Sequence, residues 1–148
     1  MHLEIKIRPG SIEEVVQISP QIPELIDPYD ATVYQTRLSG GHLILVATID
    51  GRAVGFKVGY DRYRDGKSFY SWMGGVVPDY RNRQVAVRLL ESMEDWCKKT
   101  GYCYLQFKTL NRHKSMIHFG VKNGFEITGF KENKVDSSKS KIYFKKEL

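Results

Sequence analysis

The sequence predicts a single α/β (α+β) domain with a mixed, mostly antiparallel sheet and helices on both faces. Three observations carry this prediction. Residues 42–77 read as three successive strands joined by short turns, which predicts an antiparallel meander. Two strand–helix–strand units follow, over 68–109 and 102–131, and such units allow parallel neighbours in the sheet. With 148 residues the chain is long enough for one core, so we expect residues 1–148 to form one domain.

The N-terminal elements are a strand and two short helices. Residues 3–8 alternate apolar and polar side chains, which indicates a half-buried strand. Ser11, with Glu14 three residues later, forms a capping box that predicts a helix over about 12–18. Asp30 is expected to cap a second helix, closed by a pair of glycines.

The remaining elements follow from apolar runs and turn residues. Asp50-Gly51 is a hairpin signal between two of the strands. The expected order of elements is βααβββαβαββ. After the second helix, strands are expected at 42–49, 52–60, 68–77, 102–109, 125–131 and 140–146, and helices at 85–99 and 112–123.

The charge of the chain is uneven. The formal net charge is +6, and residues 101–148, with ten basic and four acidic side chains, supply all of it. Such a segment can meet nucleic acid, a membrane surface or a phosphorylated cofactor. No basic helix is interleaved with aromatics on one face, so a nucleic-acid-binding domain ranks last among the functions that the sequence allows. No apolar run approaches the ~20 residues of a membrane span, and no signal-peptide core is present, so we expect a cytoplasmic protein.

Two cysteines, Cys97 and Cys103, fall in a predicted helix and in the strand after it. They form no CxxC motif and no disulfide framework, so both are expected to be buried free thiols. No pattern of metal ligands is present, and no metal is expected.

The stretch 76–90 has the form strand, proline, turn, helix. Pro78 ends the strand because it has no N–H to donate, and 80–84 is a polar, basic turn. The first amides of the following helix lack partners within it, and the helix dipole adds partial positive charge. Beside Arg81 and Arg83, this helix N-terminus is a candidate site for a phosphate or pyrophosphate.

The pattern Pro-x-Tyr-Arg-x-Arg-x-Val-Ala-x-x-Leu-Leu in this stretch resembles the acyl-CoA-binding motif of the GNAT N-acetyltransferase superfamily, Arg/Gln-x-x-Gly-x-Gly/Ala. Arg81 and Ala86 match the motif, whereas Gln84 stands where the family usually has glycine. Asn-Gly-Phe at 123–125 is similar to the family's closing Lys-x-Gly-Phe, and the resemblance covers about 43–130. We expect Gln84 to be tolerated through a negative φ, which accepts a Cβ.

The resemblance implies a GNAT-type fold in which the fourth and fifth strands splay and acetyl-CoA lies in the gap. An amide at Gly75 or Val76 would polarise the acyl carbonyl, and the strand edge at Val76 and Val77 would pair with the pantetheine arm. Ordinary alternatives are a β-bulge at the glycines, solvated arginines, and a helix cap at Asn111. The other cofactor-binding residues that the resemblance implies are Arg81, Arg83, Gln84, Val85, Ala86 and Asn111.

The family pattern also places a tyrosine, the usual general acid, four residues before the closing glycine. That position is Gly120 here, so the general acid is left open. His113 and His118 lie on the same predicted helix, but five residues apart and therefore on different faces. Each is expected to have a surface or capping role.

The resemblance implies an acceptor pocket formed by the first two helices and the third and fourth strands. Acidic and aromatic side chains there would suit a cationic amine; an ordinary surface of capped helices is the alternative. The predicted substrate-binding residues are Tyr29, Asp30, Tyr34 and Trp72, within a wider set that adds Glu24, Asp27, Tyr60 and Asp61.

The predicted function is transfer of an acetyl group from acetyl-CoA to an amine of a small molecule or peptide, by direct attack in a ternary complex. The alternative is a non-catalytic acyl-CoA-binding or sensing module, favoured by Gln84 and Gly120. The expected partners are acetyl-CoA and the acceptor, without membrane or nucleic acid. A homodimer, the acceptor's identity and the acyl-chain preference are left open by the sequence.

Overall fold

The computed structural model describes residues 4–148, so Leu3 of the expected first strand lies outside the described residues. The expected order of elements is observed, with three short 3-10 turns added. The strands are β1 (Ile5–Pro9), β2 (His42–Ile49), β3 (Arg52–Tyr60), β4 (Ser68–Val76), β5 (Tyr104–Leu110), β6 (Glu126–Lys131) and β7 (Lys141–Glu147). The helices are α1 (Ile12–Ile18), α2 (Ala31–Arg37), α3 (Val85–Thr100) and α4 (Lys114–Lys122), and the 3-10 turns are η1 (Ser19–Gln21), η2 (Pro78–Tyr80) and η3 (Ser137–Lys139).

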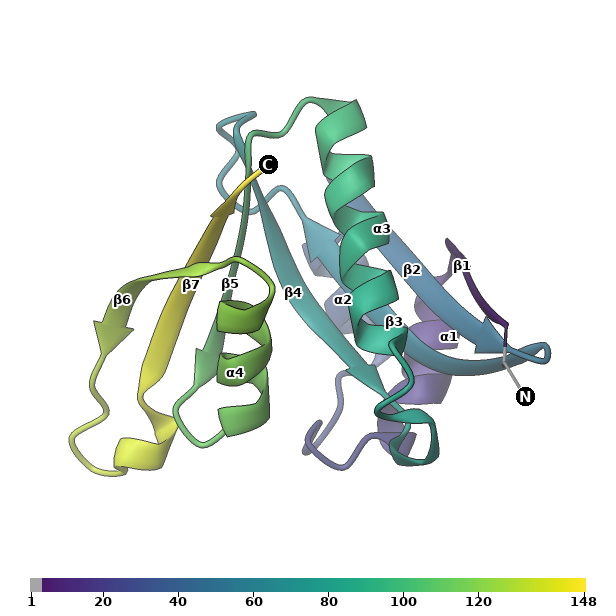
Figure 1. Ribbon diagram of the computed structural model, residues 1–148, viewed down its shortest axis with the longest axis horizontal. Helices are drawn as coiled ribbons and strands as arrows, with labels where there is room; N and C mark the ends of the chain where they lie inside the picture. Colours follow the sequence, from purple (N-terminus) through teal and green to yellow (C-terminus); the bar gives the residue numbers. More distant parts are fainter. Residues whose placement is uncertain (1–3) are drawn as a thin grey trace.

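The seven strands form one sheet in the order β1-β2-β3-β4-β5-β7-β6. Every neighbouring pair is antiparallel except β4 and β5, which are parallel. That parallel pair is short, because only Ser68–Tyr70 are in register with Tyr104–Gln106. Beyond these residues the two strands part, as Figure 1 shows, and the expected splay is confirmed.

Helices cover both faces of the sheet: α3 and α4 lie on one side, and α1 and α2 on the other (Figure 1). The core is divided accordingly. Leu89 and Met93 of α3 belong to one buried cluster, while Val15 of α1 and Tyr34 of α2 belong to the other. Within residues 4–148, no helix has both the length and the apolar character that crossing a bilayer requires.

Three of the predicted helix ends are observed, but α2 ends at Arg37, with Leu38 as its C-cap, before the pair of glycines that was expected to close it. Ser11 and Glu14 form the reciprocal capping box of α1. The Asp30 side chain accepts a hydrogen bond from the Val33 N–H at 3.2 Å at the start of α2. Gly101 ends α3 with a φ of 106°, a left-handed cap that suits glycine.

The two cysteines differ in environment. Cys97, on the buried face of α3, is buried as expected, and burial raises the pKa of its thiol to about 12. Cys103 is exposed, so the expectation of a buried thiol there was wrong. It precedes the first residue of β5, and its N–H donates to the Lys67 carbonyl at 2.7 Å, so only its backbone is tied to the fold.

Candidate active site

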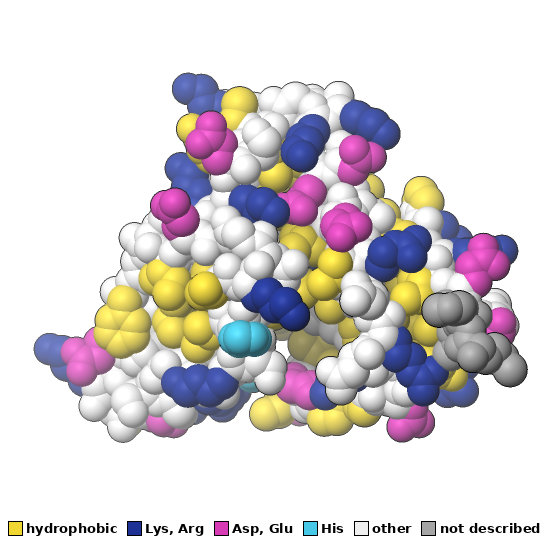
Figure 2. Space-filling view, viewed as in Figure 1, with side chains coloured by type: hydrophobic (Ala, Val, Ile, Leu, Met, Phe, Trp, Pro, Cys, Tyr) yellow, Lys and Arg dark blue, Asp and Glu magenta, His cyan; other side chains and the backbone are white. Residues whose placement is uncertain are grey.

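A cleft of about 550 Å³ opens where β4 and β5 part. This volume is within the range typical of small-molecule sites. Figure 2 shows the face with α3 and α4, where the surface is hollowed between the two helices above hydrophobic side chains. The lining residues come from the loop before α2, the middle of β3, most of β4, the end of β5 and the start of β7, and from α3 and α4.

The alternating direction of backbone hydrogen bonds along β4 decides which of its N–H groups face the cleft. The Val77 N–H donates to the Val54 carbonyl at 2.8 Å, so it is used inside the structure and is not free for a ligand. Because hydrogen-bonding direction alternates along a strand, Gly75 also faces β3, and Gly74 and Val76 face the opening. Of the two amides expected to polarise the acyl carbonyl, Gly75 and Val76, only the Val76 amide faces the cleft. The expected pairing of Val77 with the pantetheine arm was wrong.

The two glycines of β4 have packing reasons. A Cβ at Gly75 would lie 2.8 Å from Ile22, and one at Gly74 would lie 3.1 Å from the Phe56 carbonyl oxygen. The irregularity between β3 and β4 falls at Val58/Gly59, opposite Trp72, rather than at Gly74 and Gly75. A bulge is therefore not their explanation.

The turn before α3 is left-handed at its last residue. Gln84 has φ 70° and ψ 10°, so the expectation of a negative φ was wrong. This conformation explains why a glycine would suit the position, since a Cβ there costs about 1–2 kcal/mol. Gln84 makes no side-chain cap, and the first turn of α3 contains no acidic residue. The amides at this end are thus not capped by side chains, Val85 is buried in the core, and Ala86 lines the cleft.

Both arginines of the turn have partners within the protein. Arg81 donates to the Val76 carbonyl at 3.1 Å and pairs with Glu24 at 2.6 Å. Arg83 lies over the Tyr80 ring, 5.8 Å from its centre. The Arg81 pair lowers the pKa of Glu24 and fastens the turn to the loop before α2. An anion at the α3 N-terminus would therefore meet backbone amides first.

Asn111 does not line the cleft. Its amide donates to the Ser137 carbonyl at 3.3 Å, and its oxygen accepts from Lys114 at 2.8 Å. It thus holds the loop before β7 against the start of α4, and the structure does not place it in the cleft with Val76 and Ala86.

Gly120 is buried where α4 meets the sheet. A Cβ there would lie 2.8 Å from Cζ of Phe107 and 3.1 Å from Phe144. The Phe107 and Phe144 rings stack at 4.5 Å between centres. The aromatic pair from β5 and β7 therefore leaves no space for a tyrosine at this position.

The two histidines differ. His118 is exposed. His113 stands at the N-cap position of α4 but makes no side-chain cap, so of the surface or capping role expected for it, capping is not observed. Its ring lines the cleft, and burial and Arg112 lower its pKa although the Glu24 carboxylate opposes this.

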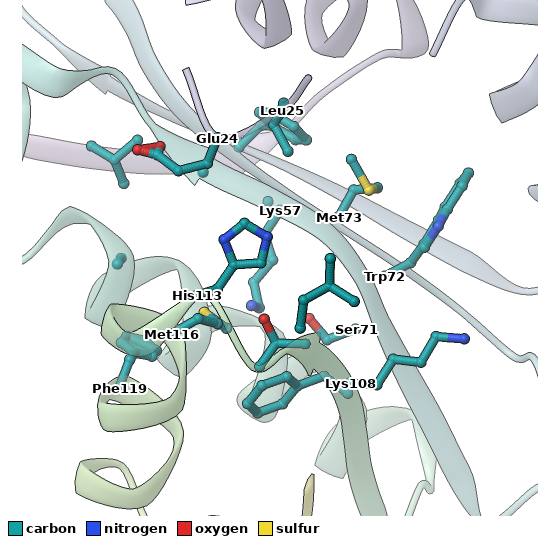
Figure 3. Close-up of a pocket in the computed structure, with 18 of the residues that line it drawn as sticks. Glu24, Leu25, Lys57, Ser71, Trp72, Met73, Lys108, His113, Met116 and Phe119 are labelled. Carbon is teal, nitrogen blue, oxygen red and sulfur yellow. The ribbon is translucent and has the colours of Figure 1, made fainter. Parts of the chain in front are cut away.

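Lys57 is a cleft residue that the sequence analysis did not predict. Figure 3 shows its side chain extending from β3 into the cleft that Ser71, His113 and Met116 also line. Within residues 4–148 its amine makes no ion pair or side-chain hydrogen bond, because the nearby Glu94 pairs with Lys146 at 2.6 Å. Burial lowers its pKa to about 8. The sequence feature that could have identified it is a lysine in the middle of a mostly apolar strand, where charged side chains are rare.

On the acceptor side, the structure brings only some of the expected residues together. Tyr29 and Trp72 line the cleft, and their rings stack at 5.6 Å. Tyr34 is fully buried, with its ring 5.2 Å from that of Trp72, and Asp30 caps α2. Neither lines the cleft, so the structure does not place them at the cleft wall with Tyr29 and Trp72. Of the wider set, Glu24 and Asp27 line it, whereas Tyr60 and Asp61 do not.

Solved structures with the same fold include acetyltransferases. Ard1 from Thermoplasma volcanium is 19% identical with a TM-score of 0.81, and the match covers 97% of each chain. The ribosomal-protein-S18-alanine N-acetyltransferase from Escherichia coli is 16% identical with a TM-score of 0.84, over 98% of this chain and 94% of that one. A GNAT family acetyltransferase from Elizabethkingia anophelis, solved with acetyl-CoA bound, is 20% identical with a TM-score of 0.77, over 97% of this chain and 98% of that one.

At these identities the likeness shows the fold. No curated protein matches the chain. The family model described as "Acetyltransferase (GNAT) family" matches residues 11–125, which include the open edge of β4, the turn before α3 and most of the cleft. The chain therefore belongs to the GNAT acetyltransferase family.

Proposed function

We propose that the protein transfers an acetyl group from acetyl-CoA to an amine of a small molecule or peptide, by direct attack in a ternary complex. One observation carries the proposal: the free edge of β4 at Val76 opens into the cleft whose wall includes the first turn of α3. A thioester carbonyl needs a hydrogen-bond donor, and a pyrophosphate needs amides at a helix N-terminus. The acetyl-CoA bound in the Elizabethkingia relative supports this assignment.

The residues present fit acetyl-CoA as cosubstrate. Backbone amides from Arg83 to Ala86 would receive the pyrophosphate, because they lack side-chain caps. Backbone donors do not depend on the side chain, so Gln84 does not remove them. Val76 would offer its amide to the acyl carbonyl, and the apolar cleft wall, including Leu89 and Phe107, would exclude water.

Direct attack makes one bond, breaks another and requires two proton transfers. The acceptor nitrogen forms a bond to the acyl carbon, and the carbon–sulfur bond breaks. The thiol that forms when the departing thiolate takes up a proton has a pKa near 8.5. We assign the Lys57 ammonium to donate a proton to it, because this amine lies in the cleft without a partner and its pKa, about 8, is close to that of the thiol. The neutral Lys57 amine then recovers a proton from the nitrogen that has become the amide.

The amine that attacks must first lose a proton, since a free alkylamine has a pKa near 10. His113 and Glu24 line the same cleft. Glu24 is held as a carboxylate in its pair with Arg81. We expect water in the open cleft to carry this proton to solvent. Neither cysteine takes part, because Cys97 is buried and Cys103 does not line the cleft.

The test is release of free CoA thiol from acetyl-CoA with a panel of amines, run beside calorimetry with acetyl-CoA. Micromolar binding and amine-dependent thiol release are expected. A second candidate, a non-catalytic acyl-CoA-binding module, is favoured by Gly120, where the general acid of the family is absent. Tight binding without thiol release for any amine would favour that module, and no binding would contradict both.

A further inference from the structure

Two lysines from neighbouring strands reach the acceptor side of the cleft. Lys108 of β5 and Lys141 of β7 both line it. Lys108 is opposite Tyr143 in the register, and Lys141 is two residues before Tyr143, so the two lysines share one face as diagonal neighbours. Phe107 packs with the α3 cluster on the opposite face. The lysines therefore face away from the helix N-terminus that would receive the pyrophosphate, and Figure 3 shows Lys108 extending on the side of Trp72.

Two arginines add positive charge near Lys108 and Lys141, and each lies over an aromatic ring of the same cleft. The Arg37 guanidinium lies 5.2 Å from the ring centre of Trp72, and the Arg62 guanidinium lies 4.9 Å from that of Tyr70. Both rings line the cleft. Stacking of this kind holds a guanidinium in place while leaving its edge N–H groups available.

In the part of the chain that the structure describes, these four cations lack acidic partners. Within residues 4–148, none of Arg37, Arg62, Lys108 and Lys141 forms an ion pair. Burial lowers the pKa of Lys108, and so do Arg62, Lys141, Arg37 and Lys131. Two carboxylates line the cleft: Glu24 is already paired with Arg81, and Asp27 is the other. A group of like charges held together without a counter-charge favours an anion from outside.

We propose that the acceptor carries an anionic group, a carboxylate or a phosphate, which binds Lys108 and Lys141 while its amine approaches the thioester. This inference rests on the proposed transfer reaction and names the class of its acceptor. It replaces the cationic acceptor expected from the sequence, because Asp30 and Tyr34 do not line the cleft and the basic side chains of β5 and β7 do. Trp72 and Tyr29 would contact the apolar part of the same molecule.

The experiment compares acceptors that differ only in charge. Short peptides of equal length with acidic, neutral or basic side chains supply the carboxylate arm, and phosphoethanolamine against ethanolamine supplies the phosphate arm. One of these two sets is expected to contain the acceptor class. Within that set, we expect kcat/KM for the anionic compound to be at least about tenfold higher than kcat/KM for the neutral one. Lys108→Ala and Lys141→Ala should each raise KM for that acceptor about tenfold, with a smaller change in kcat. Lys134→Ala, which alters an exposed lysine outside the cleft, should change neither.

Binding is measured separately from turnover, with calorimetry of the acetylated products in the presence of CoA. Tighter binding of the anionic product, weakened in Lys108→Ala but not in Lys134→Ala, supports the inference even where turnover is slow. Equal binding of anionic and neutral products, or equal kcat/KM within both charge pairs, overturns it. Failure of acetyl-CoA to bind, by contrast, contradicts the proposed function itself.

Discussion

Lys57 on β3 is directly opposite Gly74 on β4, and a Cβ at Gly74 would lie 3.7 Å from Cγ of Lys57. Lys57 is also between Gly55 and Gly59 along its own strand, and Cβ atoms there would lie 3.2 Å from Val85 and 3.0 Å from Met93. The lysine thus projects from the face that α3 covers, with a glycine on each side and another across the strand. This arrangement leaves room for a long side chain to pass from the sheet into the cleft.

The first prediction concerns proton donation by Lys57. Lys57→Met should lower kcat by about 100-fold or more, the range for a positioned acid, while acetyl-CoA still binds by calorimetry. In the wild type, the rate should fall as pH rises through about 8, because the ammonium is then lost. That alkaline limb should be absent in the variant. A tenfold or smaller loss with an unchanged pH profile would show that Lys57 donates no proton.

The second prediction concerns stability. Folding lowers the pKa of Lys57 from 10.5 to about 8, so the unfolded chain binds more protons between these values and stability rises with pH across that window. Below pH 8 the lysine is charged in both states and its burial is fully unfavourable. Lys57→Met should therefore raise Tm at pH 7 by about 2–6 °C, with the difference shrinking toward pH 10. Lys134→Met, at an exposed site, should show no such pH dependence. A lower Tm for Lys57→Met throughout would contradict this account.

The third prediction concerns the left-handed turn. Gln84→Gly should stabilise the protein by up to about 1 kcal/mol, because glycine adopts a φ of 70° without strain. It should also tighten acetyl-CoA binding by removing a side chain beside the pyrophosphate amides. Gln84→Ala is the control, since it shortens the side chain but keeps the Cβ. Denaturant unfolding and calorimetry measure the two effects. If alanine and glycine gave the same unfolding free energy, strain at this residue would be excluded.

The fourth prediction concerns close packing at Gly120. Gly120→Ala should destabilise the protein by about 1–3 kcal/mol, because its methyl group would meet Phe107 and Phe144 within the core. Gly40→Ala is the control, as a Cβ at Gly40 has no heavy atom within 4 Å. Gly120→Tyr, which places the family's tyrosine in this chain, should fail to restore a faster rate. If Gly120→Tyr folded and turned over faster than the wild type, Phe107 and Phe144 would have to move to make room for the tyrosine, which would contradict this prediction.

The fifth prediction concerns His113. His113→Ala and His118→Ala should each lose less than about tenfold in rate, below the range of a true acid or base. Burial and Arg112 lower the pKa of His113, so its ring is neutral at pH 7 and could at most accept a proton. Log-rate profiles against pH for both variants provide the measurement. Loss of turnover in His113→Ala, with acetyl-CoA binding intact, would assign the acceptor's proton to this ring.

The sequence by itself determined most of the fold, because the relevant signals are local. Alternation and turn chemistry located the meander, and capping residues located the helices: Ser11 and Asp30 cap where they were expected to. The motif around Arg81 and Ala86 indicated the family. Such features depend on neighbours within a few residues, which one sequence contains.

The tertiary structure decided which side chains meet in the cleft. Asp30 and Tyr34 belong to the expected acceptor region, yet one caps a helix and the other is buried, because burial depends on packing between distant segments. Lys57, Lys108 and Lys141 come from three strands, and only the sheet order and the parting of β4 from β5 bring them to one cleft. The left-handed φ of Gln84 was likewise set by the turn that joins β4 to α3, since the backbone must reverse there whatever side chain it carries.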